Sequence, residues 1–84
     1  MNFKIRSHIL FTVDQQCIVV VDNEKRTSLI IEYPEAALWS LMIENHDPVK
    51  ARLMLMSILH KSESETEAFI DHWQKKWEES GIIE

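Results

Sequence analysis

Short apolar runs and short polar segments alternate over the first third of the chain. Runs rich in Ile, Val, Phe and Thr occupy Ile9 to Val13, Cys17 to Asp22 and Thr27 to Ile31, and the polar segments "DQQ" and "DNEKR" separate them. β-Branched and aromatic residues in runs of this length, broken by polar turn residues, are typical of strands. The pattern predicts a three-stranded antiparallel sheet with two tight connections.

Beyond "YP" the apolar positions recur at helical spacing. Pro34 suits a first helical turn, because the missing N–H of proline costs nothing there. One face of the predicted helix then carries Ala37, Leu38, Leu41 and Met42. Asp47 followed by Pro48 is an N-cap signal and predicts the start of a second helix. The buried face of that second helix is expected to comprise Val49, Leu53, Met56 and either Ile58 or Leu59.

A third helix is predicted over the remaining residues. Ser62 or Ser64 caps its start, and the glutamates that follow favour the positive end of the helix dipole. Gly81 ends it. The expected core stripe, at positions i, i+3 and i+7, consists of Ile70, Trp73 and Trp77.

Length and composition suit one small domain spanning residues 1–84, because 84 residues with 45% hydrophobic content can bury a modest core. The longest apolar run, Cys17 to Val21, is far shorter than the roughly 20 residues that span a bilayer, and the N-terminal segment lacks the apolar stretch of a signal peptide. We therefore expect a cytoplasmic protein without a membrane partner. The single cysteine, Cys17, cannot form an internal disulfide and is expected to be a buried, inert thiol.

The charge balance argues against nucleic acid as a partner. Fourteen acidic and nine basic residues give a formal net charge of −5. A protein that neutralises phosphates needs a concentrated basic face. The two basic pairs, Lys25/Arg26 and Lys75/Lys76, lie among carboxylates. No nucleic-acid partner is expected.

Residues able to do chemistry do not gather into a recognisable site. The four histidines, His8, His46, His60 and His72, fall in separate predicted elements and lack metal-ligand spacing. The one glycine is assigned to a helix end, so no glycine-rich phosphate loop is predicted. No serine or cysteine stands in a nucleophile arrangement. We expect no enzymatic activity, no catalytic residue, no metal and no cofactor.

Apolar surface exceeds what the few predicted elements can cover. Thr27 to Ile31 carries apolar side chains on both faces and is expected to be the last strand, with one open row of backbone donors and acceptors. Phe69 lies about 100° around the third helix from Ile70, next to Trp73. It either widens the core stripe or faces a groove beside the strand. Such a groove suits an extended peptide, which can add to the sheet as a fourth strand.

The order of the segments "IVVVDNEKRTSLIIEYPEAALWSLM", "DPVKARLMLMSIL" and "EAFIDHWQKKWEESGIIE" resembles the PqqD family, the small domains called RiPP recognition elements. The resemblance covers about Ile9 to Glu84 and ends on the closing motif of Gly81, Ile82 and Ile83. It implies an α+β winged helix-turn-helix, a three-stranded antiparallel sheet followed by three helices. It also implies that a groove between the third strand and third helix binds the leader region of a ribosomally synthesised precursor peptide, which is then handed to a modifying enzyme.

On this resemblance the peptide-binding residues are the pairing strand, Thr27, Ser28, Leu29, Ile30 and Ile31, and the groove wall, Phe69, His72, Trp73 and Lys76. The chain departs from the family pattern in three places. Glu32-Tyr33 stands where a Leu-Asn pair is common, "ENHD" where a glycine is common, and Phe69 where an acidic residue is common. We therefore expect a more apolar groove than is usual in the family.

Two function classes remain open. The first is a non-catalytic adaptor for a leader peptide, whose enzyme partner is a leader peptidase or a radical SAM enzyme. Trp39 and the segment "YPEAALW" are closer to the lasso-peptide type than to members from quinone biosynthesis. The second is a winged-helix DNA-binding or transcription-regulator domain, which shares the fold. An interaction domain with another partner, or a homodimer in which a second copy covers the open strand, also remains.

Overall fold

The computed structural model describes residues 3–15, 17–44 and 47–84. Three strands precede three helices along the chain: β1 (Ile9–Asp14), β2 (Cys17–Asp22), β3 (Thr27–Ile31), α1 (Glu35–Ile43), α2 (Pro48–Leu59) and α3 (Glu63–Glu79). The predicted α+β winged helix-turn-helix, an antiparallel sheet followed by three helices, is confirmed. Gln16 of the first predicted turn and His46 lie outside the described residues.

β2 is the central strand of the sheet, which has the order β1-β2-β3 with both pairs antiparallel. Its side chains alternate between two faces, so Ile18 and Val20 are buried while Val19 and Val21 are half-buried. The cross-strand partner of Ile18 is Ile31 in β3, which is also buried. The face that carries Ile18 and Ile31 is therefore the core face of the sheet.

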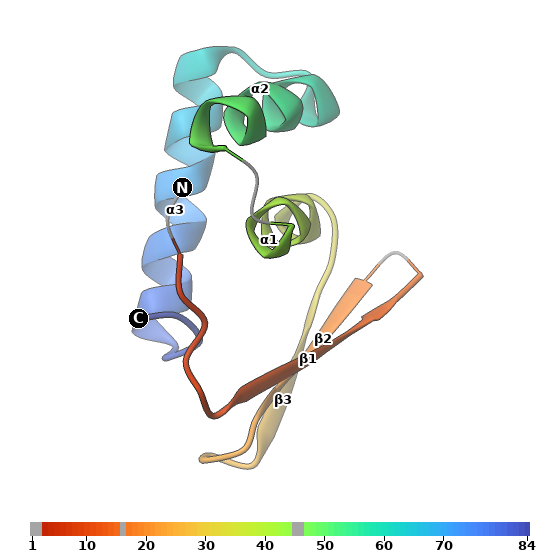
Figure 1. Ribbon diagram of the computed structural model, residues 1–84, viewed down its shortest axis with the longest axis vertical. Coiled ribbons are helices and arrows are strands. Elements are labelled where there is room, and N and C mark those ends of the chain that lie inside the picture. The colour runs from red at the N-terminus through yellow and green to blue at the C-terminus, as the bar shows by residue number, and fades with distance from the viewer. Residues whose placement is uncertain (1–2, 16, 45–46) are drawn as a thin grey trace.

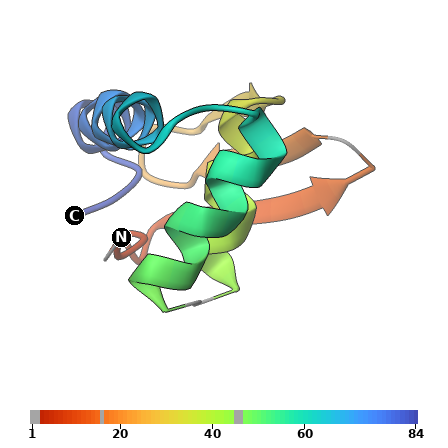
Figure 2. The ribbon, with the colours of Figure 1, turned by 90° about the horizontal axis from the view of Figure 1, so that it is seen from above.

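The helix α1 occupies the middle of the molecule (Figure 1), with the sheet below it, α2 above it and α3 along its side. Seen from above (Figure 2), α3 lies on one side of α2 and the strands lie on the other. The buried residues of α1 are Leu38, Trp39 and Leu41. The sheet and α3 are thus joined through α1.

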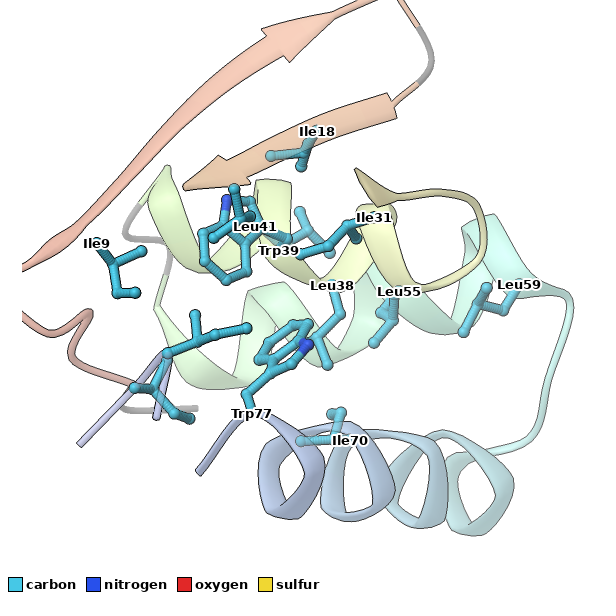
Figure 3. Close-up of a cluster of buried hydrophobic side chains, with 13 residues drawn as sticks. Ile9, Ile18, Ile31, Leu38, Trp39, Leu41, Leu55, Leu59, Ile70 and Trp77 are labelled. Atoms are coloured by element: carbon cyan, nitrogen blue, oxygen red, sulfur yellow. The ribbon is translucent and has the colours of Figure 1, made fainter. Parts of the chain in front are cut away.

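The core is one cluster of apolar side chains that connects the sheet to α3 (Figure 3). The ring of Trp39 meets that of Trp77 edge to face, with centroids 5.2 Å apart, and meets Phe11 of β1 at 5.7 Å. Aromatic pairs of this kind contribute about 0.5–1.5 kcal/mol beyond the burial of their area. Trp39 and Trp77 are almost completely buried, which confirms the prediction that Trp77 belongs to the core.

The two longer helices begin at the predicted caps. The Asp47 carboxylate accepts hydrogen bonds from the N–H groups of Val49 and Lys50 at the start of α2. Ser62 caps α3 and forms a capping box with Glu65, in which each side chain accepts the backbone N–H of the other residue. These bonds satisfy donors that a helix start otherwise leaves free.

Gly81 ends α3 as predicted. Its φ of 79° lies in the left-handed region, which favours glycine. The N–H of Gly81 donates to the carbonyl of Glu78, and the N–H of Ile82 donates to that of Trp77. This pair of bonds is the Schellman motif, and it turns the chain back toward the core.

The buried face of α2 differs from the predicted one. Ala51, Leu55 and Leu59 are buried, whereas Val49 and Leu53 are 56% and 55% exposed. The prediction was wrong for Val49 and Leu53. α2 carries apolar residues at helical spacing on two sides, and the side with Ala51 is the buried one. The sequence pattern alone does not distinguish the two sides.

The structure also corrects two smaller predictions, on Pro34 and Cys17. Pro34 is the N-cap residue of α1, which begins at Glu35, so the proline precedes the first turn. Cys17 is a free thiol at the start of β2 and is half-buried, not buried. Its side chain lies on the face of the sheet opposite Ile18, away from the core.

Segments near the two ends of the chain pair with each other. Ile5 and Ile83 form an antiparallel bridge, and the Nε of Arg6 donates to the carbonyl of Ile83 at 3.1 Å. Phe3 packs edge-on against Trp77, with ring centroids 5.8 Å apart. The paired segments therefore close the core beneath Trp77.

The burial of α2 predicts a clear contrast between two leucines of the same helix. Leu55→Ala should lower the free energy of unfolding by about 2–5 kcal/mol, because it leaves a cavity in the core. Leu53→Ala removes an exposed side chain and should change it by no more than about 0.5 kcal/mol. Urea unfolding followed by circular dichroism measures both variants, and equal losses would contradict the assigned face.

Candidate functional site

The backbone geometry of the sheet identifies the groups of β2 that bond to each neighbour. The N–H of Asn23 donates to the carbonyl of His8 at 3.0 Å, and this pair continues the β1–β2 register in which Ile9 faces Asp22. Hydrogen-bonded and non-hydrogen-bonded pairs alternate along an antiparallel ladder. The odd-numbered residues of β2 therefore bond toward β1, and its even-numbered residues bond toward β3.

The outward groups of β3 follow from the same ladder. The even-numbered residues of β2 face Thr27, Leu29 and Ile31, so these three residues direct their backbone groups inward. Ser28 and Ile30 direct their N–H and C=O groups away from the sheet, and we call these groups the free edge. Among residues 3–15, 17–44 and 47–84, no strand lies beyond β3 to pair with them. The sequence left open which of the two sets faces outward.

A pocket of about 230 Å³ lies between the start of β3 and the end of α3. Thr27 and Leu29 line it from the strand, Ser80 and Ile82 from the residues after α3, and Val20 from β2. The side chain of Leu29 lies on the core face of the sheet yet remains 39% exposed. Apolar surface is therefore accessible beside the free edge.

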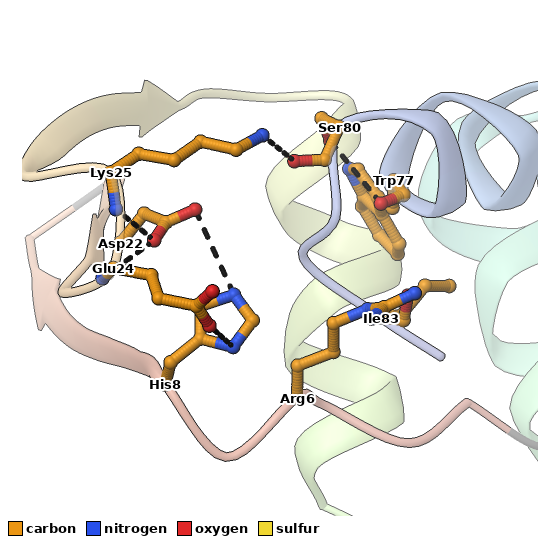
Figure 4. A network of polar contacts seen from close by, with 8 residues as sticks. All are labelled: Arg6, His8, Asp22, Glu24, Lys25, Trp77, Ser80 and Ile83. Atoms are coloured by element: carbon orange, nitrogen blue, oxygen red, sulfur yellow. Dashed lines mark hydrogen bonds and ion pairs between the residues drawn. The ribbon is translucent and has the colours of Figure 1, made fainter.

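The turn between β2 and β3 is tied both to its own strand and to the end of α3 (Figure 4). The carboxylate of Asp22 accepts the N–H groups of Glu24 and Lys25 at 3.0 and 2.9 Å. The Nζ of Lys25 donates to the carbonyl of Ser80 at 3.3 Å. These contacts hold the end of the hairpin next to the end of the helix.

Asp22 is ionised at neutral pH for reasons visible in the same turn. The hydrogen bond from the Lys25 N–H lowers the pKa of Asp22 and burial raises it, while the Glu24 N–H and the charges of His8 and Lys25 lower it further. His8 stands between two carboxylates, 3.1 Å from Glu24 and 3.8 Å from Asp22. Because the folded chain lowers this pKa, the contribution of Asp22 to stability is present at neutral pH and is lost as the pH falls.

An aromatic cluster lies on one face of α3. Ser80, the C-cap residue of the helix, lies on the same face. Phe69, Trp73 and Lys76 precede Ser80 by eleven, seven and four residues, so they share its face of the helix. The rings of Phe69 and Trp73 are 6.4 Å apart, and the Nζ of Lys76 lies 5.8 Å from the Trp73 ring centroid. The ring of His72 meets that of Trp73 at 5.0 Å. These four residues, Phe69, His72, Trp73 and Lys76, form one surface.

Phe69 lies between the two positions that the sequence left open for it, the core and the surface. It is half-buried and packs against the core, as does Trp73, so neither ring lies wholly in the interior or wholly in solvent. His72 and Lys76 are exposed at the margin of the cluster. The cluster therefore presents a partly apolar surface bordered by the ammonium group of Lys76 and the imidazole of His72.

Glu35 forms a partly buried polar link between α1 and α3. The Nε1 of Trp77 donates to the Glu35 carboxylate at 2.6 Å, which joins the first turn of α1 to α3. Burial raises the pKa of Glu35, while the hydrogen bond from Trp77 and the charges of Lys76 and His72 lower it. Glu35 therefore lies within electrostatic reach of two members of the aromatic cluster.

The structure places the predicted binding residues in two different ways. Thr27, Ser28 and Leu29 line the pocket, Thr27 and Leu29 from the core face of the sheet. The side chain of Ile31 is fully buried, and that of Ile30 is 61% exposed on the opposite face of the sheet. Ile30 thus reaches the free edge through its backbone. The aromatic cluster brings together all four predicted residues of α3.

Two residues at the site were missed by the sequence analysis. Lys25 had a weak signal, since it lies in the polar turn directly before the predicted edge strand. Glu35 had no signal, because a glutamate in a first helical turn is ordinarily explained by the helix dipole. Its role depends on Trp77, which is 42 residues away in the sequence.

A larger hollow, of about 420 Å³, lies between α2 and α3 and is lined in part by Arg52 and Glu67. The guanidinium of Arg52 already pairs with carboxylates of α3, because it contacts Glu63 at 3.4 Å and Glu67 at 3.1 Å. We therefore attribute this hollow to the contact between the helices. Within the described residues, no group of three His, Cys, Asp or Glu side chains could hold a metal ion, and no helix is long and apolar enough to cross a membrane.

Comparison with known structures finds the same architecture in a peptide complex. The structure is similar to that of TbiB1 in complex with the TbiA(beta) leader peptide, with a TM-score of 0.86 over 96% of this chain and 94% of that chain. This chain shares that fold. The two sequences are 14% identical, a level at which the likeness concerns the fold alone. No protein-family model and no curated protein matches the sequence.

The Glu35–Trp77 contact predicts opposite results for two substitutions. Glu35→Ala leaves the indole N–H buried without an acceptor and should cost about 1–3 kcal/mol of stability. Glu35→Gln keeps an acceptor and removes the partly buried charge, so at neutral pH it should be at least as stable as the parent.

The pH dependence of the Glu35→Gln comparison follows from the raised pKa. The folded chain binds the Glu35 proton more tightly than the unfolded chain does, so protonation stabilises the fold and this contribution is lost as the pH rises. The advantage of Glu35→Gln should therefore shrink as the pH is lowered into the glutamate range, about pH 4–5. Urea midpoints across this range measure it, and an advantage that grows at low pH would refute the assignment.

Proposed function

We propose that this chain is a non-catalytic adaptor that binds the leader region of a ribosomally synthesised precursor peptide. The leader adds to β3 as a fourth strand, and one row of its side chains enters the groove between β3 and α3. The observation that carries this proposal is the free edge of Ser28 and Ile30 next to an accessible apolar pocket. The fold shared with TbiB1, a protein solved in complex with a leader peptide, supports it.

The free edge cannot supply the whole affinity. Ser28 and Ile30 offer two N–H and two C=O groups, and each hydrogen bond contributes about 0.5–1.5 kcal/mol net. A micromolar complex needs about 8 kcal/mol, after the entropy cost of association has been met. Burial of one large apolar side chain contributes about 1.5–3 kcal/mol. Most of the binding free energy must therefore come from leader side chains that pack against Leu29, Phe69 and Trp73.

The adaptor would present its bound leader to a peptide-modifying enzyme, either a leader peptidase or a radical SAM enzyme. The segment "YPEAALW" favours a lasso-peptide pathway. Residues 1–84 would act as one cytoplasmic domain without metal or cofactor. Precursor and enzyme genes found beside this gene would identify the pathway.

The competing function is a winged-helix DNA-binding domain, which would place a helix in the major groove. The charge of α3 opposes it, because the helix carries Glu63, Glu65, Glu67, Glu78 and Glu79. Binding to duplex DNA would fall steeply with salt concentration. Retention of DNA at physiological salt, together with no binding of leader peptides, would favour that function over the adaptor.

Proline substitutions along β3 test strand addition. Ser28→Pro and Ile30→Pro each remove an outward N–H and place a ring against the incoming strand, so the chain should fold while leader affinity falls at least about tenfold. Leu29→Pro removes an N–H that faces β2 and should unfold the chain. Circular dichroism reports folding, and isothermal titration with overlapping peptides from a neighbouring precursor gene reports affinity.

The parent chain provides the reference for this scan and should bind one leader segment with micromolar or tighter affinity. Absence of binding to every precursor segment would count against the adaptor. Normal binding by the folded proline variants would leave the adaptor intact and refute strand addition at β3.

Phe69 predicts a mixed effect that separates it from Trp77. Phe69→Ala should weaken leader binding by about 1–3 kcal/mol and cost less folding stability than the roughly 3–5 kcal/mol typical of a fully buried phenylalanine. Trp77→Ala, the control, removes a fully buried ring and should mainly destabilise the fold. Thermal melts and titration of the two variants decide the matter, and a Phe69→Ala variant with unchanged leader affinity would assign Phe69 to the core alone.

A further inference from the structure

The free edge of β3 has N–H and C=O groups that can form hydrogen bonds with the edge strand of another sheet. An open strand edge pairs readily with another chain unless charge, proline or a bulge prevents it. β3 contains no proline and no charged residue, and Leu29 and Ile30 are 39% and 61% exposed. The edge is five residues long, so a strand of equal length can pair along all of it.

The outward set of β3 is symmetric about Leu29. If β3 meets β3 of a second copy antiparallel with Leu29 opposite Leu29, then Ser28 of each copy faces Ile30 of the other. Both residues direct their N–H and C=O groups outward, so both of these pairs are hydrogen-bonded pairs of the ladder. This register engages all five residues of the strand, whereas a shift by two residues loses part of the overlap. The Leu29 side chains meet at the two-fold axis, in the closer, non-hydrogen-bonded type of pair.

The charges that flank β3 complement each other in the same register. Arg26 precedes the strand and Glu32 follows it, and both side chains are exposed. In the register centred on Leu29, Arg26 of each copy, which is the last residue of the turn and has a φ of 55°, lies at the end of the interface where the other copy has Glu32. In the part of the chain that the structure describes, neither side chain forms an ion pair of its own. Opposite charges at facing positions stabilise strand pairing, and like charges oppose it.

We propose that two copies of this chain pair through their free edges, β3 against β3 with Leu29 at the two-fold axis, and that this pairing covers the peptide site when no leader is bound. The partner strand at the free edge is that of a second copy, because the edge is self-complementary. Its outward N–H and C=O groups, its length and the charges that flank it all match those of an identical strand. The pairing itself rests on the free edge. Its effect on the peptide site rests on the function proposed above, because a leader and a second copy would use the same groups.

Charge reversal across the two-fold axis tests the register. Arg26→Glu places two glutamates opposite each other at both ends of the interface, and Glu32→Arg places two arginines there. Each single variant should self-associate at least about tenfold more weakly than the parent. An equimolar mixture of the two variants restores opposite charges at both positions, so heterodimers should form with parent-like affinity. The double variant R26E/E32R should also recover self-association.

Sedimentation equilibrium of the purified chain over a wide concentration range gives the dimer dissociation constant. The net charge of −5 per copy opposes association, so the measurement belongs at about physiological ionic strength, where long-range repulsion is screened. Lys61→Glu is the control, since it changes the net charge as Arg26→Glu does but lies after α2, outside β3 and its flanks. It should leave self-association near the parent value.

The outcomes separate this proposal from the adaptor function. A parent chain that stays monomeric at every concentration overturns the pairing, and a mixture of single variants that stays monomeric overturns the register. Both measurements use the chain alone and need no leader peptide. If the chain dimerises as expected and no precursor segment binds, the adaptor function fails while the pairing stands. If a leader binds without dissociating the dimer, the shared use of the edge is refuted.

Discussion

The edge-to-face contact between Trp39 and Trp77 determines where the parts of this small molecule stand. Trp39 belongs to α1, which packs on the core face of the sheet, and Trp77 belongs to α3. Glu35 adds a hydrogen bond between the same two helices, one turn away from Trp39. Because interiors are close-packed, the size of these rings limits how closely α3 can approach α1. The pocket between the start of β3 and the end of α3 is lined in part by members of the same core, Ile9, Val20 and Ile82.

Much of the fold could be predicted because its signals are local. The three strands are runs of β-branched residues between polar turns, and Asp47, Ser62 and Gly81 act on backbone groups within a few residues of themselves. The orientation of α2 could not be predicted in the same way, since Val49 and Leu55 are equally suited to a core. The choice between them depends on the surfaces of α1 and α3, which are distant in the sequence.

The candidate site, like the fold, could be predicted from the sequence only in part. The edge strand and the aromatic residues of α3 were predictable, because the sequence has more apolar residues than its few elements can cover. The outward direction of Ser28 and Ile30 was not, because it follows from the pairing of Asn23 with His8 on the far side of the sheet. The fold itself survives at 14% identity to TbiB1. Such a likeness is expected when the pattern of buried positions, more than the residues that fill them, specifies the architecture.

The contact between Lys25 and Ser80 has a kinetic consequence for any strand that adds to β3. It is a single, solvent-exposed hydrogen bond of 3.3 Å across one end of the groove. Exposed side chains change rotamer within picoseconds to nanoseconds, far faster than two molecules meet in solution. Opening this end of the groove is therefore not a slow step, and the strand edge itself is held by the sheet. Capture of a guest strand would proceed at the rate of orientation-limited encounter, about 10⁵–10⁷ M⁻¹s⁻¹, and differences between guests would appear in how long each one stays bound.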